Sequence, residues 1–230
     1  MITLIDNLGL TVRVPHSPNN DIKAIWSLAI TWNPESLLTT GIFDGASPSD
    51  AQFLAGSINA ESHFHPMSIP LALLELLTVN YTEMRRELAK SLVILERDVG
   101  LIHRRESAAW NVSHWNEAKL QSLTKEINLL NTHLAYMERR FDFAMRLATF
   151  LQVLVSGEPT KTSHYVDSVP EVVVERLENA GHFLDNSFHH IKCLQKRAET
   201  VINVVSPRTG QNYAPISLSR ANYDPRRAFR

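Results

Sequence analysis

The sequence of 230 residues is poor in the features that mark several common protein classes. Its single cysteine, Cys193, excludes a disulfide within the chain and suits a reducing compartment. Glycine occurs only eight times, as expected when most of the chain is helical. The formal net charge of −1 excludes a global electrostatic attraction to nucleic acid or anionic lipid. With 44% apolar and 20% charged residues, the composition is that of an ordinary globular protein.

Long hydrophobic runs are also missing. The strongest one, residues 69–79, is about half the length needed to cross a bilayer and contains Glu75. The first 15 residues lack the basic start and apolar stretch of a secretory signal. We therefore expect a cytoplasmic chain without a membrane span, which associates with a membrane only through a partner.

The most informative pattern that is present lies between residues 120 and 151. Apolar residues recur there in alternating steps of three and four, which is a heptad seam and predicts a long helix packed lengthwise against other helices. This architecture is typical of assembly or transduction and seldom builds a catalytic cleft. The predicted core seam consists of Leu120, Leu123, Ile127, Leu130, Leu134, Met137, Phe141, Ala144, Ala148 and Leu151.

The N-terminal part, residues 1–46, follows a different pattern. Apolar and polar residues alternate at period two around residues 10–14 and 26–32, which predicts half-buried strands. Asn7-Leu8-Gly9 is a turn candidate ahead of the first strand, and residues 37–43 resemble another short strand. We interpret residues 1–46 as a small mixed β region that forms a small sheet.

The first two helices of the region 47–206 have recognisable starts. Ser47-Pro48-Ser49-Asp50 places a cap, a first-turn proline and an acid in the order typical of a helix N-terminus, and this helix should end near Asn59. Ser68 is the expected cap of the second helix. The apolar stripe of the second helix runs to Ile102, with Gly100 inside it as a weakening residue.

Two further long helices are expected. The one carrying the seam stops at Gly157, and Ser168-Val169-Pro170-Glu171 starts the last one in the manner of a capping box. Its stripe runs from Val173 to Val205. Residues 207–230, rich in arginine and proline, predict a disordered basic tail. The predicted fold is α+β and mainly α, with a small N-terminal sheet followed by three long, coiled-coil-like antiparallel helices.

Candidate chemistry is sparse. His63 and His65 stand two residues apart before a helix and are weak candidates for a metal site, because no companion ligands accompany them. Cys193 has the basic neighbours Lys192 and Lys196 and is a weak candidate for a nucleophile, yet a cysteine beside an apolar stripe is usually a small core residue. No nucleophile, phosphate-binding or dinucleotide motif occurs. We therefore predict no catalytic residues and no enzyme activity.

Clusters of mixed charge, such as Glu96-Arg97-Asp98 and Glu138-Arg139-Arg140, are typical of a solvated, ion-paired helix face. A nucleic-acid interface would need charge of one sign. We expect no nucleic-acid partner.

One stretch of sequence resembles a known family. The run His63-Phe64-His65-Pro66-Met67-Ser68-Ile69-Pro70 and the leucines after it resemble the F-H-P-x-x-I-P-L-A-L-L segment of fungal CorA-like magnesium transporter proteins. Similar blocks follow in the same order, and the resemblance covers roughly residues 20–205. The motif residues are His63, Phe64, His65, Pro66, Pro70, Glu96, Arg97, Asp98, Arg104, Arg105, Trp110 and Trp115.

This resemblance implies a cytosolic module of an oligomeric magnesium channel, with Mg²⁺ as the candidate ion and either a second copy or a full-length membrane homologue as the partner. The Gly-Met-Asn signature of the pore is absent from the sequence. We therefore expect a pore-less domain that acts by helix packing, oligomerisation or regulation and does not conduct ions alone. The alternative is a stand-alone coiled-coil adaptor with no ion-related role.

Overall fold

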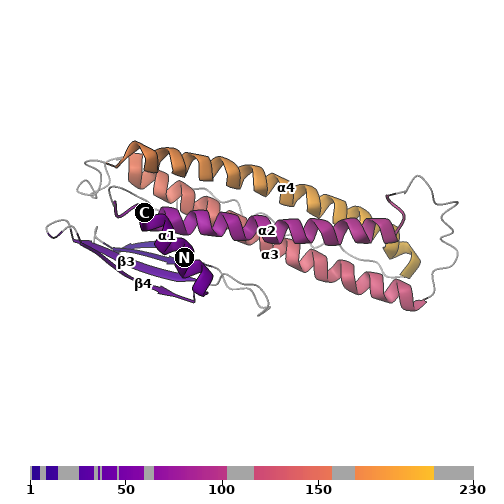
Figure 1. Ribbon diagram of the computed structural model, residues 1–230. Coiled ribbons are helices and arrows are strands. Elements are labelled where there is room, and N and C mark those ends of the chain that lie inside the picture. Colours follow the sequence, from indigo (N-terminus) through magenta and orange to yellow (C-terminus); the bar gives the residue numbers. More distant parts are fainter. Residues whose placement is uncertain are drawn as a thin grey trace.

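The computed structural model describes residues 2–5, 9–14, 26–33, 36, 38–45, 47–59, 65–102, 117–156 and 169–209. It contains a four-stranded antiparallel sheet followed by one short and three long helices (Figure 1). This arrangement confirms the predicted α+β, mainly α fold. Of the predicted turn Asn7-Leu8-Gly9 only Gly9 is described, and the part of the predicted tail beyond residue 209 lies outside the described residues.

The sheet has the order β1-β2-β3-β4, with strands β1 (Ile2–Ile5), β2 (Gly9–Arg13), β3 (Ser27–Asn33) and β4 (Leu38–Asp44). Each strand pairs with the next one in the chain, so the sheet is a simple meander. The predicted alternation is confirmed, because one face is buried and the other is exposed. The buried face carries Leu10, Val12, Leu28 and Ile30.

Helix α1 (Pro48–Asn59) begins as its sequence predicts. The Ser47 hydroxyl accepts a hydrogen bond from the backbone N–H of Asp50 at 3.2 Å, and the Asp50 carboxylate accepts one from the N–H of Ser47 at 3.1 Å. This reciprocal capping box satisfies two donors that the helix itself leaves unpaired.

The start of α2 (Ser68–Asp98) differs from the prediction. The cap position is Met67, which makes no side-chain capping bond, so the assignment of Ser68 as the cap was wrong. Instead, Nδ1 of His65 accepts a hydrogen bond from the N–H of Met67 at 3.1 Å. An imidazole one turn earlier therefore organises the helix start.

The end of α2 also corrects the sequence analysis. Gly100 has a φ of 80°, and its N–H donates to the carbonyl of Arg97 while the N–H of Leu101 donates to that of Glu96. These two bonds form a Schellman cap, which needs the left-handed conformation that glycine adopts readily. Gly100 thus ends the helix, and Ile102 lies exposed beyond it and outside the buried stripe.

Helices α3 (Glu117–Ser156) and α4 (Glu171–Thr209) contain 40 and 39 residues. The predicted seam of α3 is confirmed, since all its members are buried except the half-buried Leu120. The stripe of α4 is buried in the same way, with Phe188 half-buried. However, α4 continues through Pro207 to Thr209, so the predicted boundary at residue 206 lies inside the helix.

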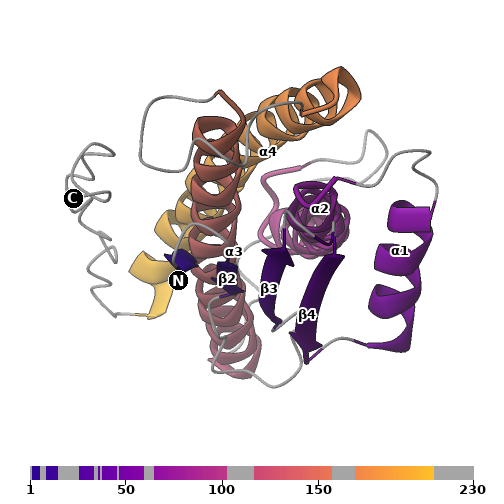
Figure 2. The same cartoon turned by 90° about the vertical axis from the view of Figure 1, so that its left-hand side faces the viewer.

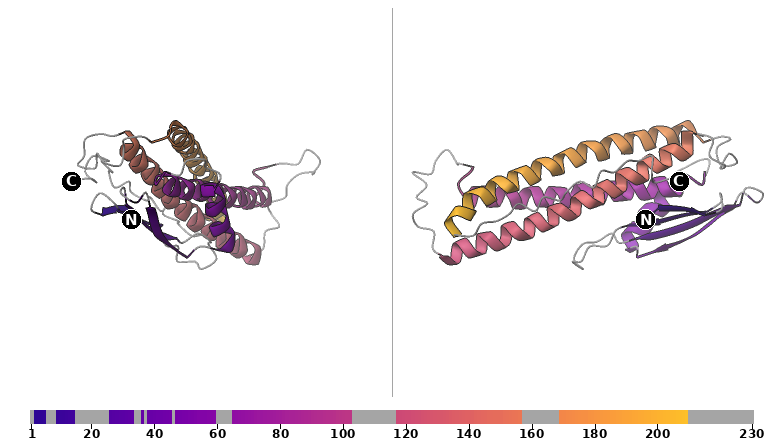
Figure 3. Two further views of the ribbon diagram at one scale, coloured as in Figure 1. Left: turned by 60° about the vertical axis from the view of Figure 1, so that its left-hand side comes forward. Right: turned by 180° about the vertical axis from the view of Figure 1, so that it is seen from behind.

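The three long helices form an up-down-up bundle, with α2 and α4 running in one direction and α3 in the other (Figure 1). The sheet lies beside one end of this rod, with α1 flanking it (Figure 2). Seen from behind, the helices α2, α3 and α4 again lie on one side of the sheet (Figure 3). Apolar residues from the sheet and the helices belong to one buried core.

Candidate functional site

We first consider the polar side chains that connect the long helices. Near the sheet end of the rod, Arg176 on α4 makes a two-pronged contact with Glu75 on α2. Nε of Arg176 donates to one carboxylate oxygen at 2.9 Å and Nη2 donates to the other at 2.7 Å. Both side chains are half-buried, which makes this pair stronger than an exposed one.

Toward the other end, Arg197 on α4 makes the same contact with Glu96 on α2. The two hydrogen bonds measure 2.8 and 2.6 Å. The hydrogen bond to Glu96 raises the pKa of Arg197, so the guanidinium is held in its charged form. Glu96 is buried, and the solvated charge cluster predicted at Glu96-Arg97-Asp98 is therefore wrong for its first member.

Helices α3 and α4 are joined by a third polar contact. Glu138 accepts hydrogen bonds from Lys192 through one carboxylate oxygen and from Gln195, at 2.8 Å, through the other. The stem of Lys192 also places its ammonium 5.4 Å from the centroid of the Phe188 ring. Charged contacts thus join α4 to both of the other long helices, α2 and α3.

The middle of the bundle holds a buried cation. Arg140 on α3 is only 2% exposed, its Nη1 lies 3.5 Å from the sulfur of Met84, and its guanidinium carbon lies 5.7 Å from the centroid of the Tyr81 ring. This contact stabilises a desolvated guanidinium through the ring's negative face. The solvated face predicted for Glu138-Arg139-Arg140 is therefore wrong at Arg140.

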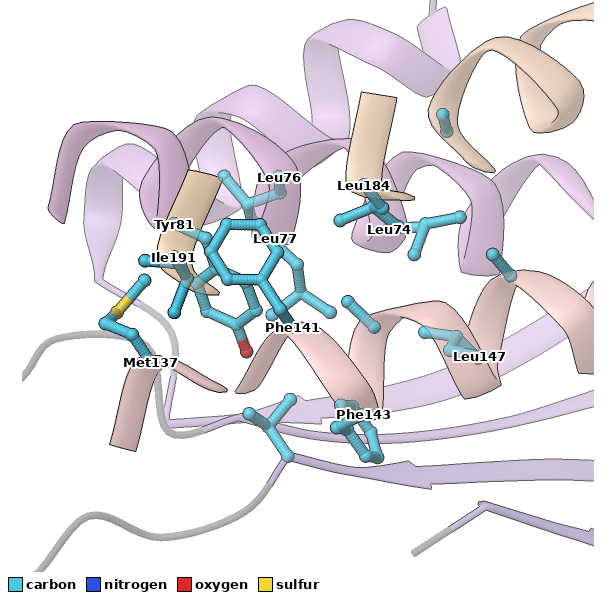
Figure 4. Packing of buried hydrophobic residues seen from close by; sticks show 14 of the residues in the cluster. Leu74, Leu76, Leu77, Tyr81, Met137, Phe141, Phe143, Leu147, Leu184 and Ile191 are labelled. Atoms are coloured by element: carbon cyan, nitrogen blue, oxygen red, sulfur yellow. The ribbon is translucent and has the colours of Figure 1, made fainter. Parts of the chain in front are cut away.

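Around this cation the core is aromatic. Tyr81 packs edge-on against Phe141 with ring centroids 5.5 Å apart, and both rings are fully buried (Figure 4). Burial raises the pKa of the Tyr81 phenol, with the nearby Arg140 acting in the opposite direction. Burial likewise lowers the pKa of Arg140. Within the described part of the chain, the Tyr81 hydroxyl has no hydrogen-bond partner.

The predicted metal candidates are not brought together with other ligands. His65 uses Nδ1 to accept the Met67 N–H, and His63 lies outside the described residues. Within the described ranges, no group of three or more histidine, cysteine or acidic side chains is arranged to hold a metal ion. Cys193 is exposed on α4 rather than buried as a core residue.

The remaining motif residues divide between the two ends of α2. Pro66 and Pro70 are buried at its start, whereas Arg97 is exposed and Asp98 half-buried in its last turn. Phe64, Arg104, Arg105, Trp110 and Trp115 lie outside the described residues.

A small hollow lies between α3 and α4 near the end of the rod far from the sheet. Its lining consists of Thr124, Ile127, Asn128, Ile202, Val205 and Ser206, and it has room for about one water molecule. Such a hollow is too small for a substrate. In a search limited to the described residues, no helix combined the length and apolar character needed for a membrane span.

Sequence reasoning missed Arg140, although a signal was present. Arg140, Phe143, Leu147 and Phe150 are all buried and repeat in steps of three and four, beside the seam that was predicted. Helix α3 contacts both α2 and α4, and it carries two adjacent seams. Arg140 is the charged first member of the second seam.

The interhelical pairs had a weaker signal. Glu75 and Glu96 border the apolar stripe of α2, and Arg176 and Arg197 border that of α4, yet many charged residues border these stripes. No protein-family model matches this chain, and no curated protein matches it at a significant level.

Proposed function

We propose that this chain is a non-conducting cytoplasmic module of a CorA-like magnesium transport system, which acts through helix packing and assembly. The proposal rests on the sequence resemblance described above and on the rod-like bundle that follows the small sheet. The bundle supplies rigidity and surface rather than a reaction chamber.

The observation that supports this most directly is the register between α2 and α4. Glu75 pairs with Arg176 and Glu96 pairs with Arg197, and each pair spans 101 residues of sequence. The second pair lies three heptads beyond the first on both helices, so the two parallel helices keep one register along the rod. A displacement at one end of α4 is therefore transmitted to the other end instead of being lost in sliding.

Such a rod acts by favouring one arrangement of helices over another. A divalent cation that binds one arrangement better shifts the population by its difference in affinity for the two. Mg²⁺ is the expected effector, and its ligands are not assigned.

The test is a titration of the purified chain with MgCl₂ into the millimolar range, followed by thermal unfolding and sedimentation velocity. We expect a change in the melting temperature or in oligomer size. NaCl at matched ionic strength is the control, because it screens surface charges without coordinating as Mg²⁺ does. Identical curves in MgCl₂ and NaCl would remove the ion-related role.

The alternative, a coiled-coil adaptor, is favoured by one observation. Three exposed apolar side chains, Val79, Val172 and Phe183, surround the Glu75–Arg176 pair at helical spacings on α2 and α4. An adaptor would capture the same cellular partner with and without Mg²⁺, and the substitution Phe183→Lys would abolish that capture. Ile94→Lys, at another exposed position of α2, is the matched control.

A further inference from the structure

The chain contains five methionines, and the structure divides the four that it describes into two kinds. Met67 and Met137 are buried, and Met137 belongs to the apolar core drawn in Figure 4. Met84 and Met145 are half-buried and pack against the margin of the same core. Because oxidation of a sulfur-containing side chain depends on its exposure, the half-buried pair is the more open to modification in the folded chain.

The sulfur of Met84 differs from that of Met145 in what it faces. Nη1 of Arg140 on α3 lies 3.5 Å from the Met84 sulfur, and Arg140 is only 2% exposed. A thioether is a weak hydrogen-bond acceptor, so this contact compensates the lost hydration of the cation only weakly. Among the described residues, no hydrogen bond to the sulfur of Met145 is found.

Oxidation by hydrogen peroxide turns such a sulfur into a strong acceptor. A lone pair of the sulfur attacks one peroxide oxygen, so that an S–O bond forms and the O–O bond breaks. The departing hydroxide takes the proton from the transferred oxygen and becomes water. The sulfur loses two electrons and the peroxide gains them, which gives methionine sulfoxide without a further reactant. The sulfoxide oxygen carries a large partial negative charge.

The position of Arg140 suits that product. With an S–O bond of about 1.5 Å and an N–H···O bond of about 2.8 Å, a bent arrangement places nitrogen about 3.8 Å from sulfur. Nη1 already lies 3.5 Å from the Met84 sulfur. The remaining shift is small, and the unbranched methionine side chain supplies it by adjusting its torsions.

We propose that Met84 is a site of oxidation by hydrogen peroxide, and that Arg140 holds its sulfoxide in a charge-assisted hydrogen bond between α2 and α3. Methionine oxidation ordinarily disrupts a core, because it places a polar group among apolar ones. At Met84 it stabilises the bundle instead, because the new oxygen faces a desolvated guanidinium. This inference does not rest on the proposed role in magnesium transport, and its tests contain no Mg²⁺.

Peroxide treatment of two variants of the full chain separates the half-buried methionines. Met145→Leu keeps Met84, and Met84→Leu keeps Met145. Both variants also carry Cys193→Ser, because the exposed thiol would react with peroxide as well. Peptide mass spectrometry measures oxidation at each methionine, and thermal unfolding measures its effect on stability.

We expect the sulfoxide of Met84 to raise the melting temperature by about 2 °C, and that of Met145 to lower it by about 3 °C. A Met84 that stays reduced in the folded chain, under conditions that oxidise it in the urea-unfolded chain, overturns the proposal. So does a sulfoxide of Met84 that lowers the melting temperature.

Glutamine at position 84 tests the acceptor without any oxidant, because its carbonyl oxygen stands in for the sulfoxide oxygen. Met84→Gln should melt about 2 °C above Met84→Leu, whereas Met145→Gln should melt below Met145→Leu. Arg140→Leu removes the donor, and replacing a buried charge by an apolar side chain is often tolerated. In that background leucine at position 84 should become the more stable. A preference for leucine over glutamine at position 84 with Arg140 present overturns the proposal, as does a preference for glutamine that persists in Arg140→Leu.

Discussion

Glu96 and Arg197 form an asymmetric ion pair: the carboxylate side chain is 8% exposed, whereas its guanidinium partner is 43% exposed. The two groups therefore face different environments if the pair is broken. An orphaned guanidinium at this site still reaches water, but an orphaned Glu96 carboxylate stays desolvated.

The first prediction follows from this asymmetry. Arg197→Met should lower the free energy of unfolding by about 2 kcal/mol, because it leaves a buried carboxylate without its two donors. Glu96→Gln should cost about 1 kcal/mol, since Arg197 can rehydrate. Urea denaturation measures both. Lys90→Met, which removes an exposed pair with Glu87, is the control and should change stability by less than about 0.5 kcal/mol. Equal costs for Arg197→Met and Lys90→Met would contradict the role assigned to the buried carboxylate.

The second prediction uses one of the two heptad positions that lie between the Glu75–Arg176 and Glu96–Arg197 pairs. Ala89 on α2 and His190 on α4 are also 101 residues apart and lie one heptad before Glu96 and Arg197. The double variant Ala89→Glu/His190→Arg should add a third pair and raise the free energy of unfolding by about 0.5 kcal/mol. A double-mutant cycle with Ala89→Gln as the neutral control isolates the coupling. Zero coupling would show that the register is not maintained between the two natural pairs.

The third prediction concerns Tyr81 and pH. Burial raises the pKa of its phenol above the ordinary value of 10.0. A group with a raised folded-state pKa contributes stability below its unfolded pKa and loses that contribution as the pH rises. The wild type should therefore lose about 1 kcal/mol relative to Tyr81→Phe between about pH 10 and about pH 11. Urea unfolding of both proteins at these two pH values gives the difference directly. Parallel pH profiles for the two proteins would mean that the phenol titrates normally.

The fourth prediction contrasts two glycines. A Cβ on Gly41 would lie 2.7 Å from the carbonyl oxygen of Ala29 and 2.8 Å from Cγ2 of Ile30. Gly41→Ala should therefore lower the free energy of unfolding by about 2 kcal/mol, because the backbone of the paired strand can shift only by disturbing the hydrogen-bonded sheet. A Cβ on Gly56 in α1 meets no atom within 4 Å, so Gly56→Ala should stabilise by about 0.5 to 1 kcal/mol. Thermal unfolding should therefore shift in opposite directions, and a shift in the same direction would contradict the described sheet packing.

Much of the fold could be predicted from local patterns. The seam from Leu123 to Leu151 predicted the buried face of α3, because heptad spacing reflects a helix geometry that does not depend on the partner. The capping box at Ser47 and Asp50 was equally local. The α2 cap was not, since the acceptor at its start is the ring of His65 and not the serine that the pattern favours.

The candidate site was harder to predict because its contacts join residues far apart in the chain. Charged residues beside an apolar stripe are usually solvated, and the repeat that Arg140 shares with Phe143, Leu147 and Phe150 does not show by itself that an arginine in it is buried. Only the packing of α3 against α2 places that arginine beside Met84 and Tyr81 and buries it.

By itself, the sequence determined that this chain forms a small sheet and three long amphipathic helices, because period two and period 3.5 are set by backbone geometry. The tertiary structure alone decided that α2 and α4 lie parallel in one register. It also decided that Glu96 and Arg140 are desolvated, and that one sheet face stays open. These outcomes depend on which surfaces pack together. The periodicity of a helix or strand does not show by itself which of its several surfaces will be buried.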